Sequence, residues 1–474
     1  MAETIDTGAV VGEPVREGDY GDRIAAVEPG GVEFIPAGDR HGRPLQLLWT
    51  WTSPNLEFAT IFVGILAVGV FGLSFWQAAL ALLLGNALGS LSQGVLSARG
   101  PKHGVPQMVL SRLGFGFWGN ALPAGLNSVT AGIGWFAVNS VSGAFALAAL
   151  TGMPALAGLL IVVAVQVVVA FFGHNLVQAF EKYALVFLGV VFVVTTIVMF
   201  ATGSHAGTPA KAIPGGFLLT AGAAFGYAAG WNPYAADYAR YLPATVNTRL
   251  TGLWAGLGVF VSCMVLELVG AVSVAPLGAS ESNPTAQFTD QLPTWLADLT
   301  LLAIALGAVS ANVLNIYSGA MSFLTLGVRM PLALRRALVA VVFGVIGFLL
   351  AWSGLQDAGS KYENFLLIIA YWIGPWLGVM FTDQFLRRGQ SVDRLLYAKW
   401  YRNWAGPIAM AIGIAVSIVL FSNQTDFTGF VARHVPGLGD IAFLVGFLLS
   451  AALYALLRPH LGALRETPPS GVDG

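Results

Sequence analysis

Charge is scarce in this sequence. Of its 474 residues, only 10% are Asp, Glu, Lys or Arg and 56% are hydrophobic, and the mean hydropathy is +0.74. Soluble domains carry about 25% charged residues, so the composition excludes a soluble domain and predicts a protein of the lipid bilayer. The formal net charge is −1, which provides no basic surface for a nucleic-acid partner.

Cysteine is almost absent as well. The one cysteine, Cys263, lies inside an apolar stretch, so neither a disulfide framework nor a thiolate metal cluster can form within one chain. Residues 114–119 spell G-x-G-x-x-G, but a dinucleotide site needs a strand–helix unit around that motif, and this apolar context does not provide one. We also find no nucleophile–base set and no phosphate-binding loop. The sequence therefore predicts no enzyme and no cofactor.

Long apolar segments, by contrast, recur along most of the chain. A helix needs roughly 20 residues to cross a bilayer, and twelve segments of about that length predict an all-α polytopic membrane protein. The first 44 residues are polar, acidic and rich in Gly and Pro, which predicts a disordered head rather than a signal peptide. The transporter domain would then span 45–458, with a tail at 459–474. The twelve helices are expected near 47–73, 75–98, 118–149, 154–173, 182–203, 215–238, 250–275, 297–325, 333–352, 362–386, 404–421 and 440–458.

The basic residues indicate how these spans are oriented. Most Lys and Arg fall at the connections from an even span to an odd one, whereas the other connections hold mainly acidic residues. Under the positive-inside rule, both termini are expected in the cytoplasm, with the protein in the cell membrane.

Two of the expected spans are interrupted by proline and polar residues. Residues 51–57 read WTSPNLE in the first span, and residues 230–234 read GWNPY in the sixth. Broken helices at matching positions of two halves point to the central site of a transporter. Because the breaks are five spans apart, spans 1–5 and 6–10 would be inverted repeats. The alternative is that the two prolines only kink packed helices. Asp237 and Arg240, just after the second break, are expected to fix a helix end.

Other polar residues stand out inside apolar spans, where charge is costly. Glu57 adjoins the first break and is predicted to be a proton or cation site. Glu267 has no such neighbour and is predicted to be a packed structural carboxyl. Asn312 and Asn315 share a helix face, where they would either recognise a planar heterocycle or hold helices together. Trp135 is preceded by Gly134, which lets another group approach its ring closely.

Six short motifs then carry a resemblance to a known family. They are residues 51–55, 85–86, 111–116, 134–136, 180–183 and 236–241, the last with the preceding Pro233 being the most specific. Together they resemble the nucleobase–cation symporter-1 family, and within it the purine–cytosine permease branch, over roughly residues 45–458. The resemblance implies a leucine-transporter-like fold. It has two inverted repeats of five helices, about 47–203 and 215–386, and two additional helices within 404–458.

The resemblance also implies where the substrate binds. Family members sandwich a flat base between an aromatic residue on helix 3 and another on helix 6, which implies Trp135 and Tyr227 beside Gly226 here. An Asn on helix 8 bonds the base, and the first break adds an Asn of its own. The substrate-binding candidates are therefore Trp135, Gly226, Tyr227, Asn312, Asn315 and Asn55.

The coupling ion is implied in the same way. Sodium-driven members hold the cation between helix 1 carbonyls and paired helix 8 hydroxyls. Here Ser310 is followed by Ala311, so one hydroxyl is missing, and Glu57 stands where many relatives carry a neutral polar residue. These departures favour the proton over sodium, with Glu57 and Ser310 as cation-coupling candidates and no certain metal site.

The predicted function is a secondary active importer of cytosine or a purine by cation symport, with alternating access around a midplane site. Alternatives within the family are transporters of uracil, allantoin, hydantoin or a vitamin such as thiamine or pyridoxine. A channel would need rings of like residues around a pore, and a sensor would need an appended signalling domain. Neither pattern is evident in the sequence, and no obligatory protein partner is expected.

Overall fold

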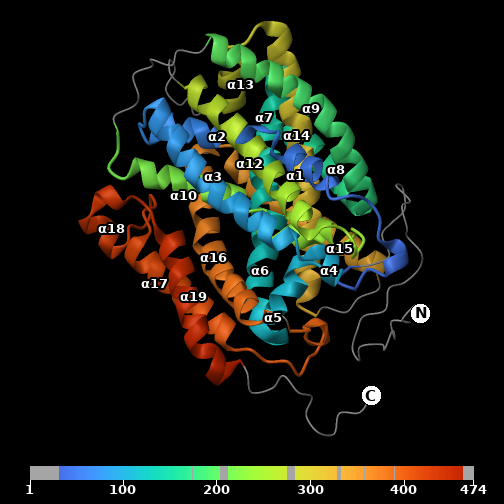
Figure 1. The fold of residues 1–474 in the computed structure, drawn as a ribbon. Coiled ribbons are helices and arrows are strands. Elements are labelled where there is room, and N and C mark those ends of the chain that lie inside the picture. Colours follow the sequence, from blue (N-terminus) through green and yellow to red (C-terminus); the bar gives the residue numbers. More distant parts are fainter. Residues whose placement is uncertain are drawn as a thin grey trace.

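The computed structural model describes residues 31–172, 174–202, 212–274, 283–327, 332–356, 358–388 and 390–462. Within these residues the chain folds into helices and forms no β-strand (Figure 1). The helices are α1 (Gln46–Thr52), α2 (Phe58–Ile65), α3 (Phe75–Ser97), α4 (Gly100–His103), α5 (Gln107–Gly119), α6 (Ala121–Val129), α7 (Phe136–Thr151), α8 (Ala155–Phe172), α9 (His174–Thr202), α10 (Gly216–Ala229), α11 (Ala235–Ala239), α12 (Thr248–Ser273), α13 (Pro284–Thr289), α14 (Thr294–Thr325), α15 (Leu332–Gly354), α16 (Ala358–Leu386), α17 (Ala405–Phe421), α18 (Phe430–His434) and α19 (Ala442–Leu461).

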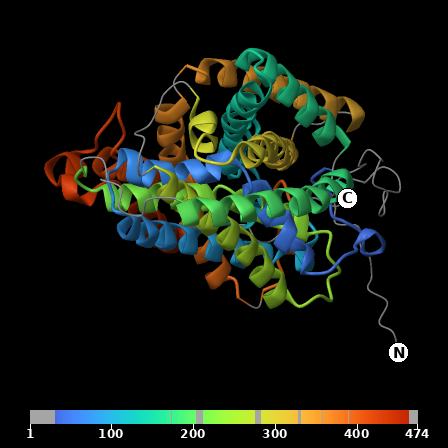
Figure 2. The ribbon, with the colours of Figure 1, turned by 90° about the horizontal axis from the view of Figure 1, so that it is seen from above.

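The predicted all-α, multi-pass architecture is confirmed. Among the described residues, seven helices are long and apolar enough to cross a membrane, or up to eight if the bent pair at the N-terminal end counts as one span. Each of the twelve expected spans overlaps one of the helices, but the count of twelve crossings stays a prediction. The C-terminal helices α17 to α19 lie at one edge of the bundle in both views (Figure 2).

The first expected break is present between α1 and α2. Residues Ser53–Asn55 form a single 3-10 turn, and Glu57 has an extended backbone (φ −155°, ψ 175°) before α2 begins. The two halves of the span are bent by 62°. Proline cannot donate a backbone hydrogen bond and clashes with the preceding turn, so the helix is interrupted where the sequence places Pro54.

The second break is present between α10 and α11, where Asn232–Tyr234 form another 3-10 turn. Asn55 joins the two breaks in space. Its side-chain nitrogen donates to the carbonyl oxygen of Trp51 at 2.7 Å, and its side-chain oxygen accepts from the Trp231 indole at 2.8 Å. The two interruptions are therefore parts of one structure rather than separate kinks.

Small residues bring α3 against the backbones of both α10 and α12. A Cβ added at Gly85 would lie 2.4 Å from the carbonyl oxygen of Ala221 on α10. A Cβ added at Gly94 would lie 2.7 Å from the carbonyl oxygen of Gly252 on α12. Membrane helices pack this closely when glycine forms the contact.

Residues 31–41 lie across one end of the bundle, which we call the N-terminal face. The buried Arg240 donates to the carbonyl oxygen of Gly31 at 2.9 Å and to the Tyr317 hydroxyl at 3.1 Å. The Tyr397 hydroxyl donates to the carbonyl oxygen of Val32 at 2.6 Å. These bonds tie the chain before α1 to α11, to α14 and to the segment before α17.

Two further observations concern this face. The Asp237 carboxylate accepts from the backbone amide of Gln107 at 2.8 Å, so Asp237 and Arg240 fix the end of the broken helix, as predicted. At the surface, a 2.6 Å hydrogen bond from His103 holds the pKa of Asp393 below its usual range. The predicted disordered head covered residues 1–44, and this prediction is wrong for residues 31–41, where Val32 and Ile35 are buried and the bonds above tie the backbone to the bundle. Residues 1–30 lie outside the described residues.

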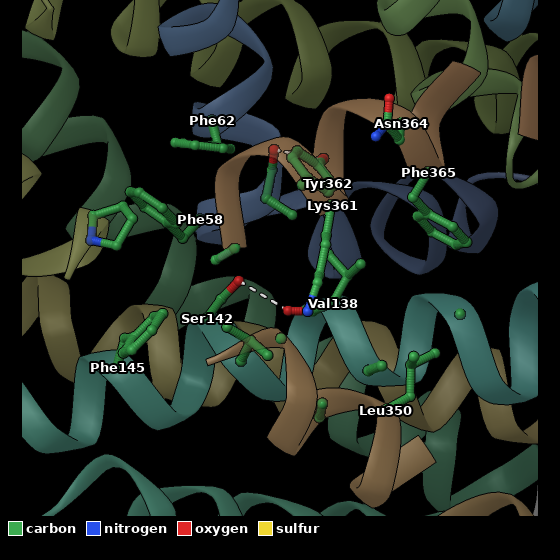
Figure 3. Close-up of a pocket in the computed structure, with 18 of the residues that line it drawn as sticks. Phe58, Phe62, Val138, Ser142, Phe145, Leu350, Lys361, Tyr362, Asn364 and Phe365 are labelled. Atoms are coloured by element: carbon green, nitrogen blue, oxygen red, sulfur yellow. Dashed lines mark hydrogen bonds between the residues drawn. The ribbon is translucent and has the colours of Figure 1, made fainter. Parts of the chain in front are cut away.

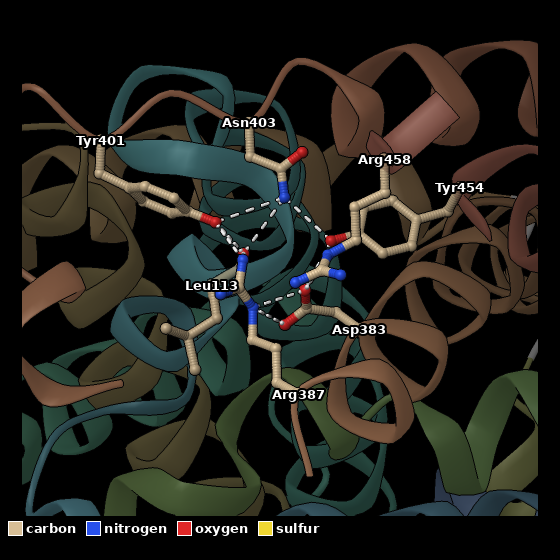
Figure 4. A network of polar contacts seen from close by, with 7 residues as sticks. All are labelled: Leu113, Asp383, Arg387, Tyr401, Asn403, Tyr454 and Arg458. Atoms are coloured by element: carbon tan, nitrogen blue, oxygen red, sulfur yellow. Dashed lines mark hydrogen bonds and ion pairs between the residues drawn. The ribbon is translucent and has the colours of Figure 1, made fainter. Parts of the chain in front are cut away.

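A buried polar network attaches the C-terminal helices to the rest of the bundle (Figure 4). Asp383 on α16 accepts from Arg387 Nε at 2.8 Å and from the Tyr454 hydroxyl on α19 at 2.6 Å. Arg387 also donates to the Tyr401 hydroxyl at 2.6 Å, which donates in turn to the carbonyl oxygen of Leu113 at 2.7 Å. The network therefore links α19 and α16 to α5.

The end of α5 depends on the same segment of the chain. Gly116 has a positive φ of 71°, which kinks the helix before α6. The next amide, of Phe117, donates to the carbonyl oxygen of Tyr401 at 3.0 Å. A Cβ at Gly116 would lie 2.4 Å from the backbone nitrogen of Asn403, so both conformation and space require glycine here.

The contact between α3 and α10 gives a test of the packing. Gly85→Ala forces the two helices apart, and we expect a loss of about 1–3 kcal/mol in stability, typical of overpacking. The measurement is thermal unfolding of the purified protein in detergent. Gly125→Ala is the matched control, because a Cβ there would meet no atom within 4 Å. Equal melting temperatures for the two variants would contradict the packing described here.

Candidate functional site

The candidate site lies where the two breaks meet the middle of α7 and α14. Gly307 allows this meeting, because a Cβ there would lie 2.3 Å from the carbonyl oxygen of Leu56 in the first break. The Ser53 and Ser310 hydroxyls face each other at 3.4 Å. From the second break, the Tyr234 hydroxyl donates to the side-chain oxygen of Asn315 at 3.2 Å.

Trp135 is held by an irregular turn and a group of rings. Residues Thr130–Trp135 form a π-helical turn before α7, a feature that occurs frequently at functional sites. The Trp135 ring meets Tyr227 edge to face, with centroids 5.3 Å apart and planes at 89°, and Phe365 likewise at 5.1 Å and 80°. The indole is 6% exposed, so it lines the protein interior.

The expected pair of Trp135 and Tyr227 is thus in contact, but the rings are perpendicular. No gap for a flat base lies between them in this conformation, so the sandwich stays a prediction that requires one ring to move. The Tyr227 hydroxyl shares a 2.5 Å hydrogen bond with Thr60 Oγ1 on α2. Gly226 faces α16 instead, since a Cβ there would lie 2.2 Å from the carbonyl oxygen of Leu366.

Asn312 and Asn315 are neighbours, but their bonding differs. The Asn312 side-chain nitrogen donates to the carbonyl oxygen of Phe136 and to Gln166 Oε1, both at 2.9 Å. Its oxygen accepts from Asn139 at 3.1 Å and from Asn315 at 3.3 Å. Asn312 therefore joins α14 to α7 and α8, which is the interhelical role that the sequence left open.

Asn139 is a further candidate site residue, and the sequence alone does not single it out. It lies four residues after Trp135 on α7, so the two share a helix face. It is buried, and its side-chain oxygen has no hydrogen-bond partner among the described residues. The spacing of an Asn one helical turn after Trp135 is the sequence signal that could have identified it.

The cation-coupling candidates lie at the first break. Glu57 is completely buried, and neither of its carboxylate oxygens has a hydrogen-bond partner within the described part of the chain. The carboxylate lies near the backbone nitrogens of Phe58 and Ala59 at the start of α2, outside hydrogen-bond geometry. Ser310 contributes one hydroxyl opposite Ser53. No group of three or more His, Cys, Asp or Glu that could hold a metal ion occurs among the described residues.

A cavity of about 310 Å³ has Tyr362 and Phe365 in its wall (Figure 3), two rings that each meet the Trp135 ring edge to face, while Trp135 itself is not among its lining residues. This volume falls at the lower end of small-molecule sites, which measure about 300–1,000 Å³. Pro284 of α13 contributes to its wall, and α13 lies at the end of the bundle opposite α5 (Figure 1). Most of its lining is apolar or aromatic. The lining residues are Phe58, Ala59, Phe62, Gly134, Ala137, Val138, Val141, Ser142, Phe145, Pro284, Leu350, Ala351, Gly354, Ala358, Lys361, Tyr362, Asn364, Phe365 and Ile368.

Comparison with known proteins gives consistent matches over nearly the whole chain. The profile of permeases for cytosine/purines, uracil, thiamine and allantoin matches residues 34–446. The putative purine-cytosine permease YxlA of Bacillus subtilis (strain 168) is 29% identical over 457 residues, which cover 92% of this chain and 97% of that protein. The purine-cytosine permease fcyB of Emericella nidulans is also 29% identical, over 494 residues, with 97% and 95% covered.

A solved structure confirms the fold that the resemblance implied. Mhp1, a nucleobase-cation-symport-1 family transporter in a closed conformation with bromovinylhydantoin bound, superposes with a TM-score of 0.72 at 19% identity. The match covers 92% of this chain and 97% of that one. The predicted leucine-transporter-like arrangement is therefore present.

The different bonding of the asparagines predicts different consequences of their loss. Asn139→Ala should weaken substrate binding about tenfold or more, because an unpaired buried partner costs about 1–3 kcal/mol, and it should lower thermal stability less than Asn312→Ala, because it removes only one bond of that network. Asn312→Ala removes bonds between three helices and should lower the melting temperature. Binding is measured by calorimetry or ligand-dependent quenching of tryptophan fluorescence. If Asn139→Ala binds substrate as the unmodified protein does, Asn139 does not belong to the site.

Proposed function

This chain belongs to the family of permeases for cytosine/purines, uracil, thiamine and allantoin, and on that premise we propose that it imports cytosine or a purine by cation symport. The observation that supports the proposal best is the meeting of a tryptophan ring, buried amides and a buried carboxyl at two paired helix breaks. The protein is a membrane transporter, and the proposal concerns its substrate, its coupling ion and its orientation.

Recognition of the base would combine shape with hydrogen bonding. The Trp135 indole offers a face for stacking, and the Asn139 oxygen and the Asn315 amide offer an acceptor and donors beside it. A base with the wrong pattern of donors and acceptors would leave these buried groups unpaired, which is the physical source of selectivity. Asn55 holds the breaks together, and thus positions the site more than it contacts the base.

The proton is the favoured coupling ion. A carboxyl in a dry membrane interior is costly when charged, and Glu57 has no cationic side chain and no hydrogen-bond partner within the described residues to offset that cost. Binding a proton removes the cost. Sodium would instead need several oxygen ligands. At this point of α14, Ser310 is followed by Ala311 rather than by a second hydroxyl residue.

The orientation follows from the positive-inside rule. We assign the N-terminal face to the cytoplasm of a cell membrane and the α13 end to the outside. Residues 31–41 close the N-terminal face through Arg240, while the cavity lined by Tyr362 and Phe365 lies toward α13. Alternating access would then open the outer side first and later release the Arg240 contacts on the inner side.

Related substrates are the alternative within the family. Uracil, allantoin, hydantoin, thiamine and pyridoxine each carry a nitrogen heterocycle with hydrogen-bonding groups, and thiamine differs from the rest in having two rings and a permanent positive charge. Uptake of labelled cytosine into proteoliposomes, with each unlabelled compound as competitor, decides among them. The reverse experiment labels each other member of this panel in turn. If neither cytosine nor a purine competes for uptake of any of them, the proposed substrate class is wrong.

Trp135 gives the first test. Trp135→Ala should weaken base binding by about 1–3 kcal/mol, the usual contribution of a stacked base, whereas Trp135→Phe should keep much of the affinity. Trp118→Ala serves as the control, since Trp118 is 52% exposed on α5. Affinity in Trp135→Ala equal to that of the control, with normal folding, would remove Trp135 from the site.

Glu57 gives the second test. Glu57→Gln has nearly the same size as the protonated carboxyl but cannot release a proton. The variant should exchange labelled for unlabelled base across proteoliposomes, because exchange moves no net proton, yet it should fail to concentrate base under an imposed pH gradient.

The matched control is Asp298→Asn, which removes an exposed carboxylate from α14 and should accumulate base normally. Two results would contradict the assignment of Glu57. One is accumulation by Glu57→Gln driven by the pH gradient, and the other is accumulation by the unmodified protein under a sodium gradient only.

A further inference from the structure

We propose that Glu267 is a second proton-binding site, and that a row of buried polar residues on α3 forms its hydrated route to the N-terminal face. The sequence predicts only a packed structural carboxyl at this position. The part that this site would play in transport rests on the proposed proton-coupled function, whereas its protonation is a property of the folded chain and can be measured without transport.

The first observation is the incomplete bonding of Glu267. Its side chain is completely buried on α12, where it meets α3 and α2. The Asn86 amide donates to Glu267 Oε2. Glu267 Oε1 and Asn86 Oδ1 have no hydrogen-bond partner among the described residues. A carboxylate accepts at about four positions, so one amide does not satisfy it.

The second observation is the absence of compensating charge. Helices α1, α2, α3 and α10 contain no Lys, Arg, His, Asp or Glu. On α12 itself the other charged residue is Arg249 in the first turn, and α9 carries its charged residues near its start at positions 174, 181 and 182. A charged carboxylate at Glu267 thus has no cation beside it on these helices, and a bound proton is what neutralises it.

The groups that do lie near Glu267 are neutral acids. Its charge acts on Cys263 one turn earlier on α12, on Tyr227 of α10 and on Tyr362 of α16. The two tyrosines are also acted on by Glu57. Both carboxyls therefore act electrostatically on Tyr227, whose hydroxyl is bonded to Thr60 at 2.5 Å, and the charge state of one changes the cost of charging the other.

The third observation is the row itself. Asn86, Ser90, Gln93 and Ser97 are spaced by four, three and four residues, so they lie along one face of α3. Each is buried. The Ser90 hydroxyl and both side-chain polar atoms of Gln93 have no hydrogen-bond partner in the described chain. At about 1.5 Å per residue, the row extends roughly 16 Å along the helix.

The two ends of the row give it a direction. Asn86 binds Glu267, and the Ser97 hydroxyl donates to the carbonyl oxygen of Ala235 at 2.9 Å, at the start of α11. Ala235 lies just before the Arg240 contacts that close the N-terminal face. Buried polar atoms without protein partners normally bind ordered water. Water along this row would connect Glu267 with the face that the proposed orientation places in the cytoplasm.

Water is the only other reactant in the two proton-transfer steps, loading and release. On loading, a hydronium ion gives a proton to a Glu267 oxygen, an O–H bond forms, and a water molecule remains. On release, that O–H bond breaks, the carboxylate keeps the electron pair, and a water of the row carries the proton to the N-terminal face.

Infrared difference spectroscopy of the purified full chain in lipid nanodiscs tests the site directly. Stepping the pH should change a band of a protonated carboxyl group, and this change should vanish in Glu267→Gln and persist in Glu57→Gln. A carboxyl band from Glu267 that is present unchanged at every pH, or a spectrum with no contribution from Glu267, would overturn the proposal. If Glu267→Gln does not fold, Glu267→Asp provides the same assignment by shifting the band.

The route has its own test. Gln93→Leu keeps Glu267 but interrupts the row, and hydrogen–deuterium exchange at the Glu267 carboxyl should slow at least tenfold. Leu88→Ala is the control, because it changes an exposed residue on α3 outside the row. Equal exchange rates in the two variants would show that the row does not serve Glu267.

Transport separates this proposal from the proposed function. If two protons move with each base, and the Glu267 proton moves only together with the Glu57 proton, Glu57→Gln loses accumulation altogether. Glu267→Gln keeps one proton per base, so its maximal accumulation at a fixed pH difference should fall to the square root of the normal value. If Glu267→Gln accumulates base to the same level as the unmodified chain, and uptake by the unmodified chain is driven by protons, the role of Glu267 in transport is wrong. The proposed proton coupling then still holds. Uptake by the unmodified chain that ignores the pH gradient would overturn the proposed coupling instead, while the infrared result would still decide whether Glu267 titrates.

Discussion

Backbone hydrogen bonding inside the membrane is the constraint on which this structure depends. Lipid offers no partner to an open N–H or C=O group, and Pro54 and Pro233 each interrupt a span. The side chain of Asn55 meets that demand at the first break, where it donates to the carbonyl oxygen of Trp51, and it reaches the second break by accepting from the Trp231 indole. The Thr60 hydroxyl adds a bond of 2.5 Å to the carbonyl oxygen of Asn55. The polar groups that must satisfy broken backbone are thereby concentrated at one depth, next to the aromatic ring and the amides.

The asparagines show how position on a helix divides structural from functional roles. Asn312 faces the seam between α7 and α8, where Phe136, Gln166 and Asn139 use its bonding capacity. Asn139 faces the interior one turn beyond Trp135 and retains a free acceptor within the described residues. The same chemical group therefore holds helices together in one place and, in another, leaves a buried acceptor without a partner among the described residues.

The sequence was sufficient to predict the fold class, both helix breaks and the polar residues around them, because each rests on local composition. Proline and polar residues at membrane depth have few alternative explanations. The bonding of Asn312, the perpendicular rings of Trp135 and Tyr227, and the packing of Gly226 against α16 depend on which helices become neighbours. The same holds for Glu267, since the polar row beside it lies on another helix. The helical spacing of these polar residues identifies the row on α3 from the sequence. Only the folded structure shows that the row lies beside the Glu267 carboxyl.

The kink at Gly116 has a consequence for the order in which the protein is made. The carbonyl oxygen of Leu113, one turn before the kink, receives its hydrogen bond from Tyr401, which lies 288 residues later in the chain. A ribosome adding roughly 5–20 residues per second needs about 15 to 60 s to cover that distance. During biogenesis α5 is therefore made long before the segment around Tyr401 exists. Until the segment around Tyr401 emerges, the carbonyl oxygen of Leu113 must form its hydrogen bond with water or with the translocation machinery. The C-terminal segment that ends at α19 therefore completes the folding of the N-terminal half.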